Sequence, residues 1–448
     1  MSFEAASPAS TPRRLLAPWA PTDERVGALP TRLDALHFTF TNRCNLRCVY
    51  CPQGSHPEEF HADVTPAFMT ALLGYLRQFQ VREASIGYYG EVLLVKGWEQ
   101  HANAILDLGV RMSAVSNFSR VLTPSEVATF ARFRQIMVSI DTHDPATLKA
   151  IRKAVDARTI VHNYHLLRAW CLRARRRAPE LVWTGVLTDR VVAQLPDFVA
   201  YAASNGVRTL SFNVVAYFSG APLGVRELID LAGAELAAAA ASVEEALALA
   251  RRLRVAMTVQ GLERLRARVA AAGADLSDTG VRVERTALQG TYTRADPGLP
   301  AGCTRLCNSP WAEAYLDPKG DVFSCCTRGI VMGRLQADTD LAAVLGNDAY
   351  RRLRQALYTG EGLDDDCRFC QIRPAVPVAM QQAQVTRRLL IAAGPGESGP
   401  LRYGLAVVVD RALALRGWIY DRSPESVRQA VRAVLRSLRG LARRRAEA

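Results

Sequence analysis

The sequence predicts an α/β protein: a partial (β/α)6 barrel, a small cysteine-rich α+β domain after it, and a basic amphipathic helix at the C-terminus. Six short β-rich runs alternate with helical stretches between residues 35 and 215, which is typical of a parallel sheet with crossover helices. Nine of the ten cysteines fall in two groups, at 44–51 and 303–370. Residues 411–445 hold ten arginines against two acidic residues.

The predicted strands share β-branched and aromatic residues and cover 36–41, 83–89, 111–117, 135–141, 181–188 and 209–215. The helices predicted between them cover 65–80, 97–108, 123–132, 145–176 and 192–205. Thr123 and Asp144, each followed by a proline, are typical of helix starts. In such a barrel the loops at the carboxyl ends of the strands carry the chemistry.

The rest of the chain divides by composition. Residues 1–33, rich in Ser, Pro and Ala, are expected to form a flexible leader before the barrel core of 34–220. A helical connection is predicted for 221–300, with the strand-like stretch RVAMTV within it. The cysteine-rich domain is predicted for 301–375, and a C-terminal extension with the basic helix for 376–448.

The overall composition is that of a globular protein, with 448 residues, 49% of them hydrophobic and 22% charged. The sequence contains no uninterrupted apolar run of membrane-spanning length and no secretory signal, so a cytoplasmic protein is predicted. Cytoplasmic thiols stay reduced, and the cysteines therefore indicate metal or redox chemistry rather than disulfides. The net charge of +13 comes largely from the tail, so no nucleic acid partner is expected.

The first cysteine group, Cys44, Cys48 and Cys51, directly follows the first predicted strand. A zinc site or a four-iron cluster normally has four protein ligands, and this group supplies three. A missing fourth ligand leaves an open metal position, which distinguishes a catalytic centre from a closed structural one. The alternatives are a zinc knuckle or a chance cluster of cysteines.

This Cys-x3-Cys-x2-Cys loop resembles that of the radical S-adenosylmethionine enzymes, in which the amino and carboxylate groups of S-adenosylmethionine chelate the open iron. The resemblance implies a TIM-like partial barrel and a catalytic [4Fe-4S] cluster on Cys44, Cys48 and Cys51. It also places Tyr50 near the adenine.

Three further segments carry the resemblance to S-adenosylmethionine sites: YYGEV (88–92), VSNFS (115–119), and VSID (138–141) together with Arg152. YYGEV (88–92) is similar to the Gly-Gly-Glu-Pro motif that receives the methionine amino group, although Tyr89 and Val92 depart from the pattern. Short polar side chains suit ribose hydroxyls, and an arginine fork suits a carboxylate. The residues that the resemblance assigns to S-adenosylmethionine in these segments are Gly90, Glu91, Ser116, Asn117, Ser139 and Arg152.

The second cysteine group closes a four-thiolate site. Cys307 and Cys325 are separated by seventeen residues that predict a hairpin with the turn DPKG, so the hairpin brings the two thiols together. Cys367 and Cys370 supply two more thiolates as a Cys-x2-Cys pair. Spacing alone leaves a structural zinc ribbon open as the alternative.

Residues 303–372 resemble the short, single-cluster form of the auxiliary iron-sulfur domain of many radical S-adenosylmethionine enzymes, the SPASM/twitch type. The resemblance implies an auxiliary [4Fe-4S] cluster on Cys307, Cys325, Cys367 and Cys370. Cys303 and Cys326 are extra cysteines, and either could replace a neighbouring ligand.

The tail segment 423–445 places apolar residues on one helical face and arginines on the other. Two interpretations stay open. The helix either packs its apolar face on the protein with the arginines in solvent, or it makes a weak contact with a membrane surface or an anionic partner.

Together the two resemblances imply an oxidoreductase-type enzyme. It would reductively cleave S-adenosylmethionine to a 5'-deoxyadenosyl radical, which takes a hydrogen atom from an unactivated carbon in an oxidation, an epimerisation or a related rearrangement. The auxiliary cluster is expected to anchor the substrate or accept an electron, and a reducing partner such as flavodoxin or ferredoxin is expected.

The length of the predicted leader bears on the substrate class. Residues 1–33 are too short for an N-terminal peptide-binding domain, which favours a small molecule such as a sugar or an aminocyclitol over a ribosomal peptide or a protein side chain. The rival of another class is a non-catalytic zinc or iron-sulfur module with a basic partner-binding tail.

Overall fold

The structure is a computed structural model, and it describes residues 23–51, 53, 61–87, 90–153, 155–214, 225–271, 282–283, 292–293, 299–326, 331–335, 340–368, 370, 373–398 and 400–422. Residues 29–378 belong to one compact unit, and residues 23–28 with 379–422 belong to a second. Tyr88, Tyr89 and the predicted basic helix of 423–445 lie outside the described residues.

Seven parallel strands, hydrogen-bonded in chain order, form the main part of the sheet in the first unit. They are β1 (Ala35–Phe38), β2 (Glu83–Ile86), β3 (Arg111–Ser116), β4 (Gln135–Ser139), β5 (Glu180–Leu187), β6 (Thr209–Val214) and β7 (Ala256–Gln260). The first six match the predicted strands, and β7 falls on the strand-like stretch RVAMTV. The arrangement is a partial TIM-like barrel.

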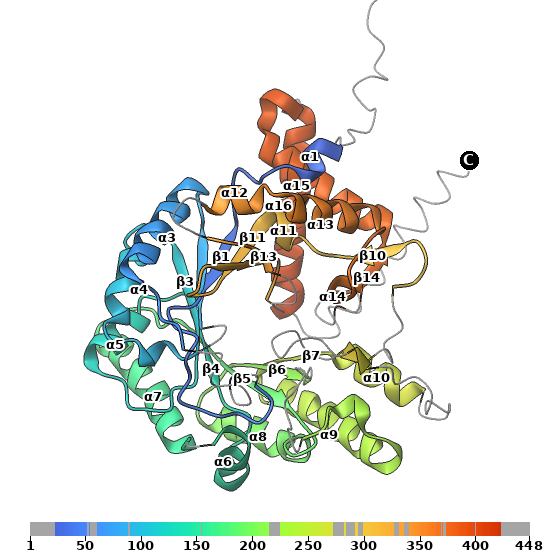
Figure 1. The fold of residues 1–448 in the computed structure, drawn as a ribbon. Helices are drawn as coiled ribbons and strands as arrows, with labels where there is room; N and C mark the ends of the chain where they lie inside the picture. Colours follow the sequence, from blue (N-terminus) through green and yellow to red (C-terminus); the bar gives the residue numbers. More distant parts are fainter. Residues whose placement is uncertain are drawn as a thin grey trace, which may run out of the picture. The chain divides into compact units, whose positions relative to one another are not determined.

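Helices cover the outer side of this curved sheet (Figure 1). The helices in this part of the chain are α3 (Pro66–Gln78), η3 (Val92–Leu94), α4 (Trp98–Leu106), α5 (Pro124–Phe130), α6 (Pro145–Arg152), α7 (Ala157–Arg173), η4 (Val192–Gln194), α8 (Leu195–Ser204), η5 (Leu228–Asp230), α9 (Gly233–Arg252) and α10 (Leu262–Ala270). The predicted caps are confirmed, because the Thr123 side chain accepts from the Glu126 N–H and the Asp144 side chain accepts from the Thr147 N–H.

The single helix predicted for 145–176 is wrong, because the structure has two. Helix α6 ends at Arg152, where Lys153 takes a positive φ of 55°, and α7 begins after Asp156 as its N-cap. A non-glycine residue with positive φ cannot continue a right-handed helix. The break matters for the site because it fixes where Arg152 lies.

The core of the barrel lies between the sheet and the helices. Trp183 of β5 is fully buried and packs against Tyr164 of α7 and Phe198 of α8. Since side chains alternate along a strand, Thr184 and Val182 lie on the opposite, lumen-facing side of the sheet.

The cysteine-rich segment continues the barrel sheet. Strand β11 (Glu313–Leu316) pairs in parallel with β1, and β12 (Asp321–Phe323) and β13 (Val331–Arg334) follow antiparallel. In the predicted turn, the Asp317 carboxylate accepts from the N–H groups of Lys319 and Asp321. The hairpin predicted from the sequence is therefore present, and it joins the barrel at its first strand.

The other elements of this segment surround the hairpin or precede it. They are β8 (Arg282–Val283), β9 (Tyr292–Thr293), β10 (Cys303–Arg305), α11 (Ser309–Ala312), α12 (Leu341–Leu345), α13 (Asp348–Thr359), α14 (Asp365–Arg368) and β14 (Ala375–Pro377). Strands β10 and β14 pair antiparallel, which brings residues 303–305 beside 375–377.

The second unit contains α1 (Asp23–Gly27), α15 (Val378–Ser398) and α16 (Pro400–Arg422). Helix α15 is kinked at Gly394, whose φ is 73°. Residues 23–33 were assigned to the flexible leader, yet α1 is helical and Leu33 is fully buried. Residues 23–33 thus differ from the predicted flexible leader, and its other residues, 1–22, lie outside the described part.

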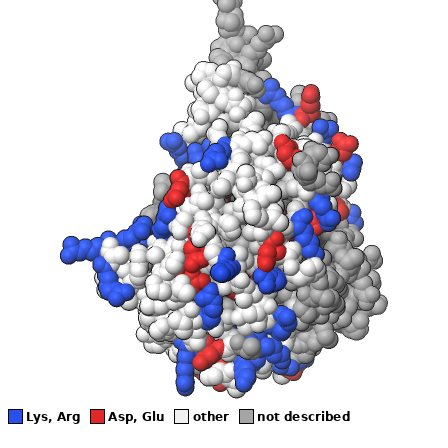
Figure 2. Space-filling view, turned by 60° about the vertical axis from the view of Figure 1, so that its left-hand side comes forward, with Lys and Arg blue, Asp and Glu red and all other residues white. Residues whose placement is uncertain are grey.

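Basic and acidic side chains are interspersed on the face drawn in Figure 2. Within the part of the chain that the structure describes, no helix is both long and apolar enough to cross a membrane.

Candidate functional site

The three cysteines of the first group lie in the loop after β1, and all are half-buried. The Cys51 N–H donates to the Cys48 carbonyl oxygen over 3.0 Å, which turns the loop back on itself. The pKa of Cys44 and of Cys48 is raised to about 12, mainly by burial and to a smaller extent by a neighbouring thiol. These groups are therefore stable as thiols until a metal replaces the proton.

The turn after β2 lies directly against this cysteine loop. Gly90 has a φ of 99°, and a Cβ at this position would lie 2.2 Å from the Thr41 carbonyl oxygen. The next residue, Glu91, donates its N–H to the Arg43 carbonyl oxygen over 2.8 Å. Only a glycine fits so close an approach at this φ, and the approach sets Glu91 beside the loop of the first cysteine group.

The Glu91 carboxylate is almost completely buried, at 2% exposure. Its Oε1 accepts from the Ser116 hydroxyl at 2.8 Å and the Leu93 N–H at 3.2 Å, and its Oε2 accepts from the Asn117 N–H at 2.7 Å. Burial raises the pKa of Glu91, while these three hydrogen bonds lower it. A carboxylate accepts about four hydrogen bonds, so one acceptor position on Oε2 is left for a ligand cation.

Asn117 connects this carboxylate to the cysteine loop. Its side-chain Nδ2 donates to Asn45 Oδ1 at 3.0 Å and lies 3.9 Å from Cys44 Sγ. Glu91, which was predicted to receive the methionine amino group, and Asn117, which was predicted to bind the ribose, are therefore hydrogen-bonded to each other next to Cys44. The Ser116 hydroxyl donates to Glu91.

Arg152 is held in a buried ion pair. Its Nε lies 2.7 Å from Asp141 Oδ2 and its Nη2 lies 2.9 Å from Asp141 Oδ1, and the Tyr50 hydroxyl donates to the same carboxylate. The Arg152 guanidinium is also 5.8 Å from the centre of the Tyr50 ring. The cysteine loop is anchored here, because the Val49 N–H donates to the Ile151 carbonyl oxygen over 2.9 Å.

Ser139 ends β4 and is half-buried in register with Thr184 of β5. The structure thus places all the predicted S-adenosylmethionine residues at the carboxyl ends of β1 to β4 or in the loops and helices that follow them. Two of them differ from the simplest expectation, since Ser116 donates to Glu91 and Arg152 already holds Asp141.

The predicted ligands of the second cysteine group lie in one neighbourhood of the fold. The charges of Cys325 and Cys370 contribute to raising the pKa of Cys307 and of Cys367. Burial is the largest cause, and it raises the pKa of Cys307 to about 11. Cys326 is also close to Cys325 and Cys370.

Arg305 ties the two halves of this group together. Its guanidinium donates to the carbonyl oxygens of Cys367, Arg368 and Arg373, at 3.0 Å for Cys367 and 3.2 Å for Arg373. Arg305 lies two residues before Cys307, so it holds the Cys-x2-Cys segment next to the first ligand of the group.

Both cysteine groups fit an iron-sulfur cluster by the chemistry of their donors. Thiolates are the usual ligands of such clusters, and the free cysteines are grouped as three and five partly buried thiols, with Cys303 on the adjoining strand. Within the described ranges, no three His, Cys, Asp or Glu side chains form a site for a metal ion by themselves.

Family comparisons agree with this geometry. Residues 38–169 match the radical SAM superfamily, and residues 307–371 match SPASM, an iron-sulfur cluster-binding domain. This chain contains a radical SAM domain and a SPASM domain. The first match contains Cys44, Cys48 and Cys51 with the Glu91 and Arg152 sites, and the second contains the four predicted auxiliary ligands.

A curated protein similar to part of this chain is a probable GTP 3',8-cyclase of Methanocaldococcus jannaschii. The two are 27% identical over 129 residues, which are 29% of this chain and 43% of the relative. The match thus spans less than half the length of that relative.

Two crystal structures of Streptococcus suis SuiB have a similar fold. SuiB bound to S-adenosylmethionine matches with a TM-score of 0.53 and 15% identity over 76% of this chain and 72% of that one. SuiB bound to its precursor peptide SuiA matches with a TM-score of 0.52 and 15% identity over 74% of this chain and 69% of that one. At this identity the likeness concerns the fold alone.

The radical SAM domain uses a [4Fe-4S] cluster with S-adenosylmethionine, and the SPASM domain binds auxiliary iron-sulfur. The residues described above fit both groups, with thiols for each cluster and a buried carboxylate beside Cys44 for the cationic amino group of S-adenosylmethionine.

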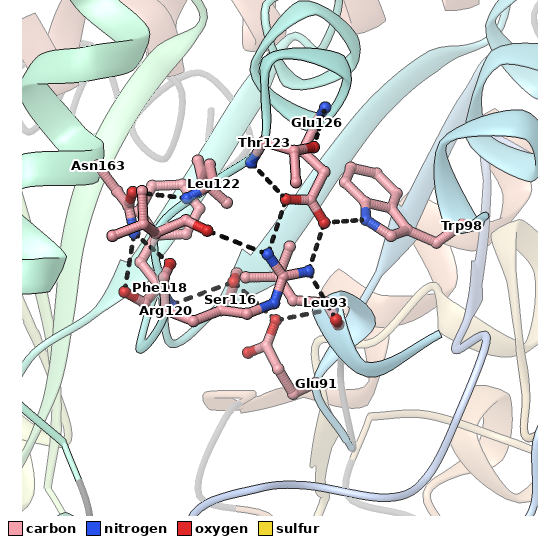
Figure 3. Close-up of polar contacts among 11 residues, drawn as sticks. Glu91, Leu93, Trp98, Ser116, Phe118, Arg120, Leu122, Thr123, Glu126 and Asn163 are labelled. Carbon is pink, nitrogen blue, oxygen red and sulfur yellow. Dashed lines mark hydrogen bonds and ion pairs between the residues drawn. The ribbon is translucent and has the colours of Figure 1, made fainter. Parts of the chain in front are cut away.

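Sequence reasoning missed the residues that hold this site in place. Asp141 is the partner of Arg152, and Arg120, Glu126 and Asn163 bracket the loop after β3 (Figure 3). Asp141 had a signal, because a carboxylate at the end of the apolar run IMVSI is unusual. Arg120 and Asn163 had none, since Leu93 is distant in sequence from Arg120, and the partners of Asn163 are all distant from it.

Proposed function

We propose that this protein reductively cleaves S-adenosylmethionine and uses the resulting radical to remove a hydrogen atom from an unactivated carbon of its substrate. When bound, the reduced cluster and S-adenosylmethionine supply a 5'-deoxyadenosyl radical for that step. An electron donor such as flavodoxin or ferredoxin would provide the electron. The net reaction is an oxidation, an epimerisation or a related rearrangement.

The observation that carries this proposal is the buried Glu91 carboxylate, which Asn117 connects to Cys44. A buried carboxylate with three neutral donors favours a cation at its remaining acceptor position. The methionine ammonium is such a cation, and its place beside Cys44 would put it next to the open iron. Arg152 has N–H groups beyond the two on Asp141 and would receive the carboxylate of the same ligand.

The lumen side of the sheet supports a neutral, hydroxyl-bearing substrate. Ser139, Thr184, Ser211 and Thr258 are in register across β4 to β7. They lie on the face opposite Trp183, which packs under the helices. Uncharged hydroxyl groups bind sugar-like hydroxyls well, so a small molecule such as a sugar or an aminocyclitol is the proposed substrate class. A ribosomal peptide or a protein side chain is the alternative.

The auxiliary cluster on Cys307, Cys325, Cys367 and Cys370 would anchor the substrate or accept an electron from it. Because β11 pairs directly with β1, the hairpin between Cys307 and Cys325 belongs to the same sheet as the strand that precedes the loop of Cys44, Cys48 and Cys51. This continuity supports a shared active site for the two clusters.

An anaerobic assay tests the proposal. Protein reconstituted with iron and sulfide, reduced and supplied with S-adenosylmethionine should form 5'-deoxyadenosine. The triple variant with Cys44, Cys48 and Cys51 changed to Ala should form none, yet keep the absorbance of the auxiliary cluster. Cys171→Ala, in a buried position of α7, is the control and should retain activity. Activity in the triple variant, or none in the parent protein, would refute the proposal.

A further inference from the structure

A cluster of polar contacts outside the cysteine loops holds the turn that carries Glu91 (Figure 3). Glu91 is the N-cap of η3, where its Oε1 accepts from the Leu93 N–H. The carbonyl oxygen of the same residue, Leu93, accepts from Arg120 Nη2 at 2.8 Å. The backbone of Leu93 therefore connects the two side chains, because its N–H binds the Glu91 carboxylate and its carbonyl oxygen binds the Arg120 guanidinium.

Arg120 is itself fixed by a carboxylate. Its Nη1 lies 2.8 Å from Glu126 Oε2, and its Nη2 contacts Glu126 Oε1, which makes the pair bidentate. Glu126 is 3% exposed and also accepts from the Trp98 indole N–H at 3.1 Å and the Thr123 N–H at 2.8 Å. The guanidinium thus connects η3 to the start of α5 and, through Trp98, to α4.

The loop that contains Arg120 is held on its other side by Asn163 of α7. Asn163 is fully buried, its Nδ2 donates to the carbonyl oxygens of Phe118 and Arg120, and its Oδ1 accepts from the Leu122 N–H. Phe118 has a positive φ of 47°, which costs energy for a bulky residue and persists only where the surroundings enforce it. Asn117, whose N–H reaches Glu91, directly precedes this strained residue.

We propose that Arg120 is a positioning residue for S-adenosylmethionine, because its fork to Glu126 and Leu93 fixes the η3 turn and with it the Glu91 carboxylate beside Asn117. The proposal rests on the assignment of Glu91 to the methionine ammonium. The planar fork is essential, since a lysine ammonium cannot make a bidentate pair with Glu126 and also reach the Leu93 carbonyl with the same geometry.

The test compares Arg120→Gln and Arg120→Lys with the parent protein, each reconstituted to its full iron content. Both variants should bind S-adenosylmethionine about tenfold more weakly in anaerobic calorimetry, as expected for residues that orient a ligand-binding group. The KM for S-adenosylmethionine should rise by a similar factor, while the rate of 5'-deoxyadenosine formation at saturation should change less.

Arg132→Gln is the matched control. Arg132 makes the same kind of bridge between α4 and the turn after α5, because its Nη1 contacts Asn103 Oδ1 and its Nη2 contacts Asp107 Oδ1, both at 2.6 Å. In the part of the chain that the structure describes, its side-chain hydrogen bonds go to Asn103 and Asp107 and none reaches η3. Arg132→Gln should therefore bind S-adenosylmethionine like the parent protein.

A double-mutant cycle with Glu91→Gln separates positioning from general stability. If Arg120 acts through Glu91, Arg120→Gln should weaken binding little further in the Glu91→Gln background. Parental affinity in both folded Arg120 variants, additive effects in the cycle, or loss of folding in both variants would overturn the proposal. Parental affinity in Glu91→Gln would instead refute the proposed role of Glu91, and a parent protein that forms no 5'-deoxyadenosine would refute the proposed function.

Discussion

Asp141 and Arg152 form a bidentate ion pair in the interior of the barrel, with Arg152 at 7% and Asp141 at 1% exposure. The Val186 N–H and the Tyr50 hydroxyl also donate to the Asp141 carboxylate. The pair therefore joins the carboxyl ends of β4 and β5 to the end of α6 and to the loop that contains Tyr50.

Replacing Asp141 by Asn should strongly destabilise the protein. The change leaves the Arg152 charge buried without its partner, and breaking a buried pair from one side costs about 3–5 kcal/mol. Urea unfolding under anaerobic conditions measures the loss.

The control for this variant is Asp63→Asn. Asp63 pairs with Arg43, but both side chains are 43% exposed, and such pairs contribute about 0–1 kcal/mol. An equal loss of unfolding free energy in the two variants would show that the Asp141–Arg152 pair contributes no more to stability than an exposed ion pair.

Most of the fold could be predicted from local patterns. The six strands and the caps at Thr123 and Asp144 could be predicted because they depend on residues that are close in the sequence. The parallel pairing of β11 with β1 was not, because Glu313 and Ala35 are distant in sequence and a strand pattern does not name its partner.

The site was predictable to the same extent. The cysteine spacing and the Gly90-Glu91 pair indicated candidate ligand residues, because their chemistry is visible in the sequence. Arg120 and Asn163 were not identified, because a side chain in solvent and one that holds a loop in place look alike in the sequence until tertiary contacts are known. The helix break at Lys153 was missed because helical propensity favours continuation there.

The ligands of the auxiliary cluster lead to a second prediction. Reconstituted protein should contain about eight iron atoms per chain, from two four-iron clusters. Cys367→Ser should lose about half of them, because Cys367 lies with Cys307, Cys325 and Cys370. Cys303→Ser should retain the full amount of iron, since Cys303 is not among the groups that most affect the pKa of Cys307 or of Cys367.

Iron and sulfide analysis with zinc determination decides this prediction. Zinc in place of half the iron would identify the second site as a zinc ribbon. Loss of iron from Cys303→Ser would make Cys303 a ligand.

Arg305 gives a third prediction, on assembly of the auxiliary site. Arg305→Gln removes the donors that hold the carbonyl oxygens of Cys367 and Arg373. The Cys-x2-Cys segment should then be less well placed, and the auxiliary cluster should form to a lower extent, with catalytic-cluster absorbance unchanged. Arg368→Gln changes an exposed side chain of the same segment and should have no such effect. Equal cluster content in the two variants would argue against this role of Arg305.

The last prediction concerns Gly90. An alanine Cβ there would lie 2.2 Å from the Thr41 carbonyl oxygen and 2.9 Å from that of Arg43, and backbone atoms cannot rotate away. The β1 and β2 loops must then separate, which displaces Glu91 from Asn117. Since displacements of about 1 Å at a binding group can cost up to 100-fold, we expect Gly90→Ala to weaken S-adenosylmethionine binding roughly tenfold or more.

Gly109→Ala is the control that isolates the steric effect. Gly109 also has a positive φ, of 79°, but a Cβ there would meet no atom within 4 Å. Both variants bear the backbone strain of alanine at positive φ, about 1 kcal/mol, and only Gly90→Ala forces two loops apart. If the two variants bound S-adenosylmethionine equally well, the contact between the Gly90 turn and the cysteine loop would not determine the position of Glu91.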